Sequence, residues 1–201
     1  MTARRALLAL AAALAAALLS VLVFWPEPGP PDAAGGVPLG TPVDFTLRSP
    51  AGPWRLADQR GKVVLLYFGY TACPDICPTS LTATAAGLRA LTAAELERVQ
   101  PVFVSVDPER DLQPQLSEYA AFFHPRLVGI TGNPAAVAAA ARPFGVVYRK
   151  QRVGGATDYV VDHSALTYVV APDGRLVERL PHAAPADQVV AAVRRHLSPA
   201  P

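Results

Sequence analysis

The chain's only two cysteines, Cys73 and Cys77, lie in one short segment, Cys-Pro-Asp-Ile-Cys. This spacing allows a structural disulfide, a redox dithiol or a thiolate metal site. In a helix, residues four apart share a face at a Cα separation of roughly 6 Å, which a disulfide can bridge. Such a bridge closes a very short loop and adds little stability, so a structural disulfide is the weakest of the three interpretations.

The two remaining interpretations differ in what else they require. The usual redox dithiol has two residues between its cysteines, whereas this segment has three. Two thiolates with a third soft or borderline ligand suit Cu(I) well. Zinc is the rival metal, but a closed structural zinc site needs four ligands and would require two further side chains here.

A third ligand would have to come from the histidines. His124 is predicted at a helix end, where a partly charged imidazole helps the helix dipole. His182 follows a predicted strand end and His196 lies on an amphipathic C-terminal helix, so a solvated or capping side chain is the ordinary role of all three. His163 lies between two predicted strands, in Asp-His-Ser, from where its side chain could reach a neighbouring loop.

From spacing alone, two roles of His163 are equally well supported. It is either a metal ligand or a loop histidine hydrogen-bonded to Asp162 or Ser164. If His163 binds a metal, Asp162 is a candidate to orient its ring.

The hydrophobic pattern predicts the elements that must position these side chains. Residues 62–70 form a nearly continuous apolar run, typical of a buried central strand, and the cysteines follow its carboxyl end, where sites in open α/β sheets are found. The order of elements predicts an α/β fold with a mixed central sheet and flanking helices. The other expected elements are a hairpin at 43–56, a helix from Pro78, a strand at 101–106, a helix at 113–123, a strand at 126–131, a helix from Asn133 to Arg142, a hairpin at 144–161, a hairpin turning at Asp173-Gly174 and a helix at 186–197.

The N-terminal segment is predicted to lie outside this domain. Arg4 and Arg5 precede an uncharged run to residue 25, long enough to span roughly 30 Å of hydrocarbon. We expect residues 1–25 to be a single-pass membrane anchor with a cytoplasmic N-terminus, the alternative being a cleaved signal peptide; both export the domain. Residues 26–42 are rich in proline and glycine and are predicted to form a spacer, and residues 43–198 are predicted to form the domain.

The charge balance argues against nucleic-acid binding. The chain has 18 basic residues, two of them in the anchor segment, which leaves 16 against 16 acidic residues. A nucleic-acid footprint requires a clear basic excess.

Three motifs together resemble the Sco (SenC/PrrC) family. They are GYTACPDICPTSL at 69–81, VSVDPERD at 104–111 and YVVDHSALTYVVAPDGRL at 159–176, and the resemblance covers roughly residues 42–197 plus the anchor. It implies a thioredoxin-like fold and one copper per chain, held by Cys73, Cys77 and His163, with Asp107 and Asp111 near the site.

The resemblance also implies a role and partners. Members are membrane-anchored copper proteins of cytochrome c oxidase assembly. We therefore expect this chain in the bacterial inner membrane as a single-pass protein, with the domain facing the periplasm or cell exterior. The expected function is a metallochaperone that delivers copper, or reducing equivalents, to the binuclear copper centre of oxidase subunit II, with other periplasmic copper chaperones or thiol reductases as further partners. Such a factor is not an enzyme in the sense of catalytic turnover.

Other function classes remain open beside this one. The main alternative is an extracytoplasmic thiol–disulfide oxidoreductase with Cys73 as nucleophile and Cys77 as resolving thiol. Only the copper site has a necessary use for His163. A peroxidase of the same fold would need an arginine near an activated cysteine, and none flanks the cysteine segment. A copper or redox sensor that signals to a partner would carry the same residues as the chaperone.

Overall fold

The computed structural model describes residues 35–153 and 159–197. The predicted anchor at 1–25 and most of the spacer lie outside these ranges, so both stay predictions. Among the described residues, no helix combines the length and apolarity that crossing a membrane requires.

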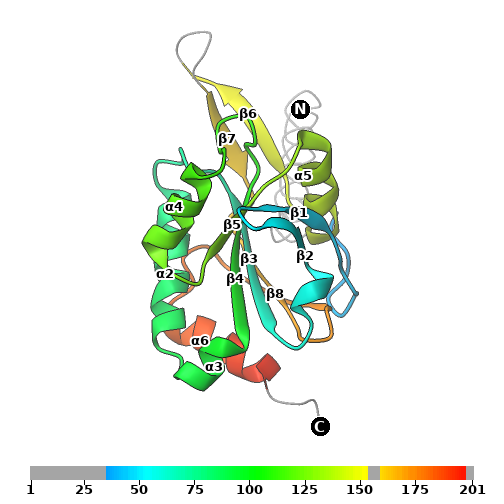
Figure 1. The fold of residues 1–201 in the computed structure, drawn as a ribbon, viewed down its shortest axis with the longest axis vertical. Coiled ribbons are helices and arrows are strands. Elements are labelled where there is room, and N and C mark those ends of the chain that lie inside the picture. The colour runs from blue at the N-terminus through cyan, green and yellow to red at the C-terminus, as the bar shows by residue number, and fades with distance from the viewer. Residues whose placement is uncertain (1–34, 154–158, 198–201) are drawn as a thin grey trace, which may run out of the picture. The chain divides into compact units, whose positions relative to one another are not determined.

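A five-stranded mixed sheet forms the centre of the fold (Figure 1). Its strand order is β5-β4-β3-β8-β9; β3, β4 and β5 run parallel, while β8 is antiparallel to both β3 and β9. Every residue of β3 is buried, because β3 has a strand on each side and a layer on each face, which explains its continuous apolar sequence. The predicted mixed sheet is thus confirmed. The strands are β3 Val63–Gly69, β4 Val99–Ser105, β5 Val128–Ile130, β8 Thr167–Val170 and β9 Leu176–Leu180.

Successive residues of β3 point to opposite faces, and each face has its own cover. On one face, Leu65 belongs to a core cluster with Leu88 and Val193, from the helices α2 and α6. On the other face, Phe68 packs against Phe144, with ring centroids 5.4 Å apart. Figure 1 shows α2 and α4 on one side of the sheet and α5 with β1 and β2 on the other. These elements are α2 Ile76–Arg89, α4 Gln115–Phe123, α5 Pro134–Ala141, α6 Ala186–Leu197, β1 Thr46–Ser49 and β2 Gly52–Arg55.

Local signals fixed several element ends as predicted. Asn133 caps α5 by accepting a hydrogen bond from the backbone N–H of Ala136, and Pro134 occupies the first turn. A short 3-10 helix, Arg142–Phe144, continues α5 beyond its last regular turn. The sequence reading missed α3, Ala93–Glu97, although Thr92 and Glu95 form a capping box there.

The strands β6, Tyr148–Arg152, and β7, Tyr159–His163, form a two-stranded sheet of their own. They pair antiparallel, with Tyr148 opposite His163. The predicted hairpin is therefore confirmed, but within the described residues its strands pair with no strand of the central sheet. His163, the last residue of β7, is consequently held by contacts other than the main ladder.

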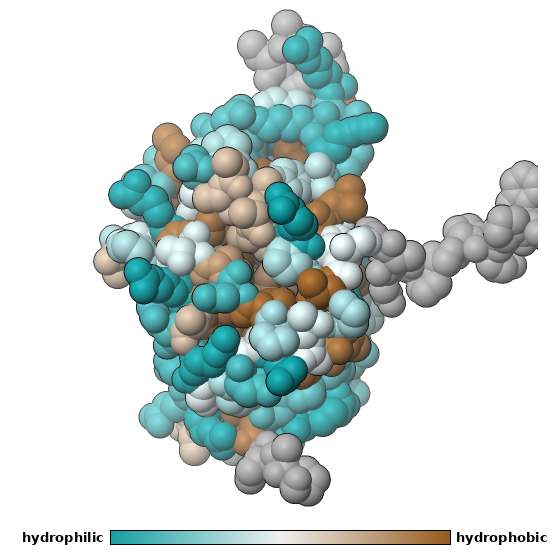
Figure 2. All heavy atoms as spheres, turned by 90° about the vertical axis from the view of Figure 1, so that its right-hand side faces the viewer, coloured by the Kyte–Doolittle hydropathy of each residue, from teal (hydrophilic) through white to brown (hydrophobic). Residues whose placement is uncertain are grey.

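Figure 2 looks onto the side of the molecule that faces right in Figure 1. Hydrophobic side chains form small groups there, surrounded by hydrophilic ones. The buried hydrophobic side chains are instead collected on the two faces of the central sheet.

Candidate metal centre

The cysteines follow the carboxyl end of β3 directly, as predicted. Cys73 lies in the loop before α2, and Cys77 lies in the first turn of α2, which begins at Ile76. The two cysteines therefore do not share a helical face, because Cys73 precedes the helix. The backbone N–H of Cys77 points back at Cys73 and donates to its Sγ over 3.4 Å. This contact places the Cys73 sulfur beside the first turn of α2.

Gly69, at the end of β3, leaves room for the Cys77 sulfur. A Cβ atom at residue 69 would lie 2.6 Å from Cys77 Sγ and 3.0 Å from the ring of Phe103. The absence of a side chain here therefore sets how closely the first turn of α2 approaches the sheet.

Gly69→Ala is expected to destabilise the protein by about 1–3 kcal/mol, the usual cost of overpacking a core. The added methyl group must displace either the Cys77 sulfur or the Phe103 ring. Urea denaturation measures the loss, and copper titration of the same variant reports on the displaced sulfur. An unchanged unfolding midpoint together with unchanged copper affinity would show that residue 69 can carry a side chain without displacing the Cys77 sulfur.

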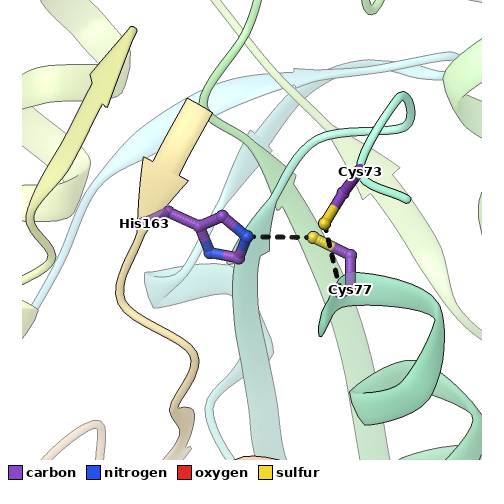
Figure 3. Close-up of side chains that lie close together, drawn as sticks. All are labelled: Cys73, Cys77 and His163. Atoms are coloured by element: carbon purple, nitrogen blue, oxygen red, sulfur yellow. Dashed lines mark hydrogen bonds between the residues drawn. The ribbon is translucent and has the colours of Figure 1, made fainter. Parts of the chain in front are cut away.

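His163 brings its imidazole to these sulfur atoms from the end of β7 (Figure 3). Its Nε2 lies 3.1 Å from Cys77 Sγ, although 86 positions separate the two residues. One ligand atom each of Cys73, Cys77 and His163 lie within 4.8 Å of one another. Metal–sulfur and metal–nitrogen bonds are about 2.0–2.3 Å long, so one ion reaches all three atoms after a small contraction.

The backbone carbonyl of Ser164 orients the imidazole ring. His163 Nδ1 lies 3.1 Å from this oxygen, a contact that assigns the proton to Nδ1 and leaves the lone pair of Nε2 directed at Cys77. The prediction that Asp162 orients the ring is wrong. The Asp162 carboxylate instead accepts a hydrogen bond from Gln151, on the exposed side of the hairpin.

Burial sets the protonation state of the site. It raises the pKa of the Cys77 thiol far above its usual range, and the charge of Cys73 adds to the effect. Burial also lowers the pKa of His163. Without metal, Cys77 is therefore a thiol at neutral pH and His163 a neutral imidazole, so the S–H can donate to Nε2.

The site opens to solvent on one side. Cys77 is buried, whereas Cys73 is partly exposed. A depression of about 370 Å³ runs over Cys73 and His163 and is bordered by Pro74, Ile76 and Val160, among others. An incoming group therefore meets Cys73 first. On the inner side, the rings of Tyr67 and Tyr70 both contact the His163 imidazole edge-on, with centroids 6.1 and 5.8 Å away.

The two aspartates of the VSVDPERD segment lie near the site, but outside the group of ligand atoms. Both Asp107 and Asp111 are fully buried. Asp111 accepts hydrogen bonds from the backbone N–H and the hydroxyl of Thr71, two positions before Cys73. Asp107 accepts one from the hydroxyl of Tyr159, in β7. The VSVDPERD motif predicted that both aspartates lie near the site. No feature of the sequence identified Thr71 or Tyr159 as their hydrogen-bond partners.

The other three histidines do not approach the cysteines. His124 caps the C-terminal end of α4 but is buried, and its pKa is lowered by burial and by the charges of Arg89 and Arg126. The predicted partly charged imidazole is therefore wrong. His182 is exposed and hydrogen-bonded to Ser80 over 2.8 Å. His196 lies 3.3 Å from Glu178, at the end of α6.

The donor set suits copper. Two sulfur donors and one neutral imidazole match the preference of Cu(I) for soft ligands, and three ligands leave the metal open on one side. A closed structural zinc site would require a fourth side chain, and the described residues offer only these three donors in the cluster.

Comparisons with known proteins agree with this chemistry. The family model SCO1/SenC matches residues 40–198. The mouse Protein SCO2 homolog, mitochondrial, is 43% identical over 157 residues, which cover 77% of this chain and 62% of the mouse protein. The chain thus spans less than two thirds of the length of that relative, and 59% of its human counterpart.

Solved structures confirm the predicted thioredoxin-like fold. Apo Sco1 from Thermus thermophilus is 46% identical, with a TM-score of 0.72 over 83% of this chain and 99% of that one. ScoI from Bradyrhizobium japonicum, solved with copper bound, is 34% identical, with a TM-score of 0.71 over 79% of this chain and 100% of that one.

Proposed function

The chain belongs to the SCO1/SenC family, and we propose on this basis that it is a copper-binding factor of cytochrome c oxidase assembly. It binds one copper ion per chain through Cys73, Cys77 and His163. Its role is to deliver this copper to the binuclear centre of oxidase subunit II, or to keep the thiols of that centre reduced.

The observation that carries the proposal is the approach of His163 Nε2 to Cys77 Sγ, over 3.1 Å. A dithiol reductase has no need of an imidazole at this place, whereas a metal site does. The open side beside Cys73 supports transfer, because a thiol of the recipient can attack the metal there and replace one ligand at a time. A closed four-ligand site would hold the ion more firmly.

The proposed location is the bacterial inner membrane. Residues 1–25 would anchor the chain by a single span, with the domain on the periplasmic side, where its partner thiols also lie. In that compartment the two cysteines must be kept reduced before they bind metal, because a disulfide is not a thiolate ligand. Other periplasmic copper chaperones or thiol reductases are therefore expected to act before copper loading.

His163→Ala tests the proposal directly. We expect the protein with reduced thiols to bind one Cu(I) per chain, and the variant to bind it at least about 100-fold more weakly, since even residues behind a ligand contribute 10–100-fold. Chelator competition measures both affinities, and circular dichroism checks the fold. His182→Ala is the matched control, because His182 is exposed and lies outside the ligand cluster. Parent-like copper binding by His163→Ala would contradict the three-ligand site.

A thiol–disulfide oxidoreductase remains the second candidate. The partly exposed Cys73 and buried Cys77 have the arrangement of an attacking and a resolving thiol. An oxidoreductase would retain its rate of disulfide reduction in His163→Ala, and it would bind no stoichiometric copper.

Copper affinity is expected to increase with pH. The raised pKa of Cys77 means that the thiol keeps its proton at neutral pH and must lose it to bind copper. Each released proton makes the apparent affinity rise about tenfold per pH unit, as long as the pH is below the pKa of that thiol. The lowered pKa of His163 means that protons compete for the imidazole only at acid pH, where the dependence becomes steeper. Chelator competition titrations between pH 6 and 8 measure this dependence. A copper affinity that does not change over this range would refute the prediction.

A further inference from the structure

The hairpin that carries His163 is fixed at its base by two contacts. The backbone N–H of Ser164 donates to the carbonyl of Val147 over 2.9 Å, and the N–H of Val147 donates to the Ser164 hydroxyl over 3.0 Å. His163 lies next to this base. Among the described residues, neither β6 nor β7 pairs with a strand of the central sheet, so side-chain contacts hold the rest of the hairpin. Val161, in the middle of β7, is buried in the core, and a second polar attachment lies at the far end of the strand.

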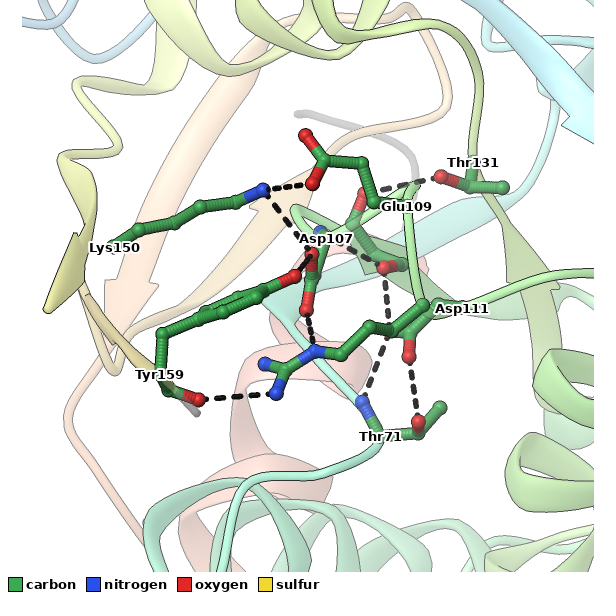
Figure 4. A network of polar contacts seen from close by, with 9 residues as sticks. Thr71, Asp107, Glu109, Asp111, Thr131, Lys150 and Tyr159 are labelled. Atoms are coloured by element: carbon green, nitrogen blue, oxygen red, sulfur yellow. Dashed lines mark hydrogen bonds and ion pairs between the residues drawn. The ribbon is translucent and has the colours of Figure 1, made fainter. Parts of the chain in front are cut away.

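Tyr159, at the other end of β7, supplies this second attachment (Figure 4). Its hydroxyl donates to the buried carboxylate of Asp107 over 2.8 Å. Its carbonyl accepts a hydrogen bond from Arg110 over 3.0 Å, and the same guanidinium lies 3.7 Å from the centroid of the Tyr159 ring. Arg110 also pairs with Asp107, so ring, carbonyl and hydroxyl are all held by one loop.

Lys150, in the neighbouring strand β6, reaches the same loop. Its Nζ lies 2.6 Å from a carboxylate oxygen of Glu109 and 3.7 Å from one of Asp107. It also lies 4.7 Å from the centroid of the Tyr159 ring. Both strands of the hairpin are thus attached to the loop after β4.

The same loop also holds the cysteine segment. Asp111 accepts two hydrogen bonds from Thr71 and a third from the hydroxyl of Ser105, over 2.6 Å. The Ser105 hydroxyl in turn accepts the backbone N–H of Asp107 over 3.1 Å. Residues 107–111 therefore connect the segment that carries the two sulfur ligands with the hairpin that carries the imidazole.

We propose that Tyr159 is a positioning residue for copper binding, which sets the distance from His163 to the cysteines through its attachment to Asp107 and Arg110. This inference rests on the proposed function, because it assumes that His163 is a ligand. Tyr159 and His163 lie four positions apart in one strand and so share a face, from which Tyr159 contacts Asp107 and His163 contacts Cys77. With Tyr159 at one end and Ser164 at the other, β7 is held on both sides of the ligand.

Tyr159→Phe removes only the hydroxyl bond to Asp107, while the ring and the carbonyl that contact Arg110 remain. We expect this variant to bind Cu(I) about tenfold more weakly, the lower end of the range for residues that orient a ligand. In Cu(II)-loaded protein, the nitrogen hyperfine signal of the imidazole should weaken or become heterogeneous. Chelator competition and electron paramagnetic resonance of the full-length protein measure the two effects.

A double-mutant cycle separates positioning from general destabilisation. If Tyr159 acts through His163, Tyr159→Phe has no further effect on copper affinity in a His163→Ala background. Equal losses in both backgrounds, or no loss in either, would overturn the inference. Gln151→Ala is the matched control within the hairpin, because it removes a cross-strand bond to Asp162 on the face away from the loop. A tenfold loss in this control would also overturn the inference.

Failure of the inference can be distinguished from failure of the proposed function. If His163→Ala weakens copper binding and Tyr159→Phe does not, His163 remains a ligand and only the positioning role is rejected. If His163→Ala itself binds copper like the parent, the three-ligand site is rejected and the positioning role with it.

Discussion

Cys73→Ser and Cys77→Ser should each abolish stoichiometric Cu(I) binding. A serine hydroxyl is a hard, neutral donor, whereas Cu(I) prefers soft thiolates. Serine therefore does not replace the missing thiolate as a copper ligand in either variant. We expect affinity to fall by well over 100-fold, more than for loss of a residue that merely orients a ligand. Anaerobic chelator competition with reduced protein measures the loss.

The two serine variants should differ in stability. Cys73 is partly exposed, so its replacement should change the free energy of unfolding by no more than about 0.5 kcal/mol. Cys77 is fully buried, but the serine hydroxyl can donate to His163 Nε2 as the thiol does. We therefore expect a loss of at most about 2 kcal/mol, which leaves the protein folded. Retained copper affinity in either variant would contradict a site built on two thiolates.

Asp111→Ala is expected to have the largest effect on stability. The carboxylate is fully buried and accepts three hydrogen bonds, two from Thr71 and one from Ser105. Its removal leaves the buried Ser105 hydroxyl and two half-buried Thr71 donors without an acceptor, at about 1–3 kcal/mol for each buried donor and less for a half-buried one, and so should reduce the free energy of unfolding by about 3 kcal/mol. This is a large share of the roughly 5–15 kcal/mol by which a domain is stable.

Chemical denaturation of metal-free and copper-loaded Asp111→Ala would test this effect. Because Thr71 lies two positions before Cys73, the loosened loop should also weaken copper binding. The control is Asp173→Ala, whose exposed carboxylate pairs with the Arg175 side chain and accepts the backbone N–H of Arg175, and should contribute about 1 kcal/mol. If both variants unfold at the same denaturant concentration, the network around Asp111 is not a major source of stability.

The sequence by itself determined the elements whose signals are local. The apolar run of β3 indicates burial on both faces, Asn133-Pro134 favours the start of a helix, and Asp173-Gly174 supplies the turn between β8 and β9. The cysteine segment directly after β3 indicated a site at the end of the sheet, and family motifs pointed to His163. Apart from the family motifs, which identified His163 by resemblance, these signals depend on neighbouring residues, which the sequence displays directly.

Only the tertiary structure decided how these parts meet. The structure shows that α2 begins between the two cysteines. It also shows that the Ser164 carbonyl, and not Asp162, orients the His163 ring, and that the imidazole of His124 is buried and neutral. It also joined Tyr159 to Asp107, across 52 positions of the chain. Such contacts depend on how separate elements pack, and no periodicity or spacing within one segment encodes a partner in another.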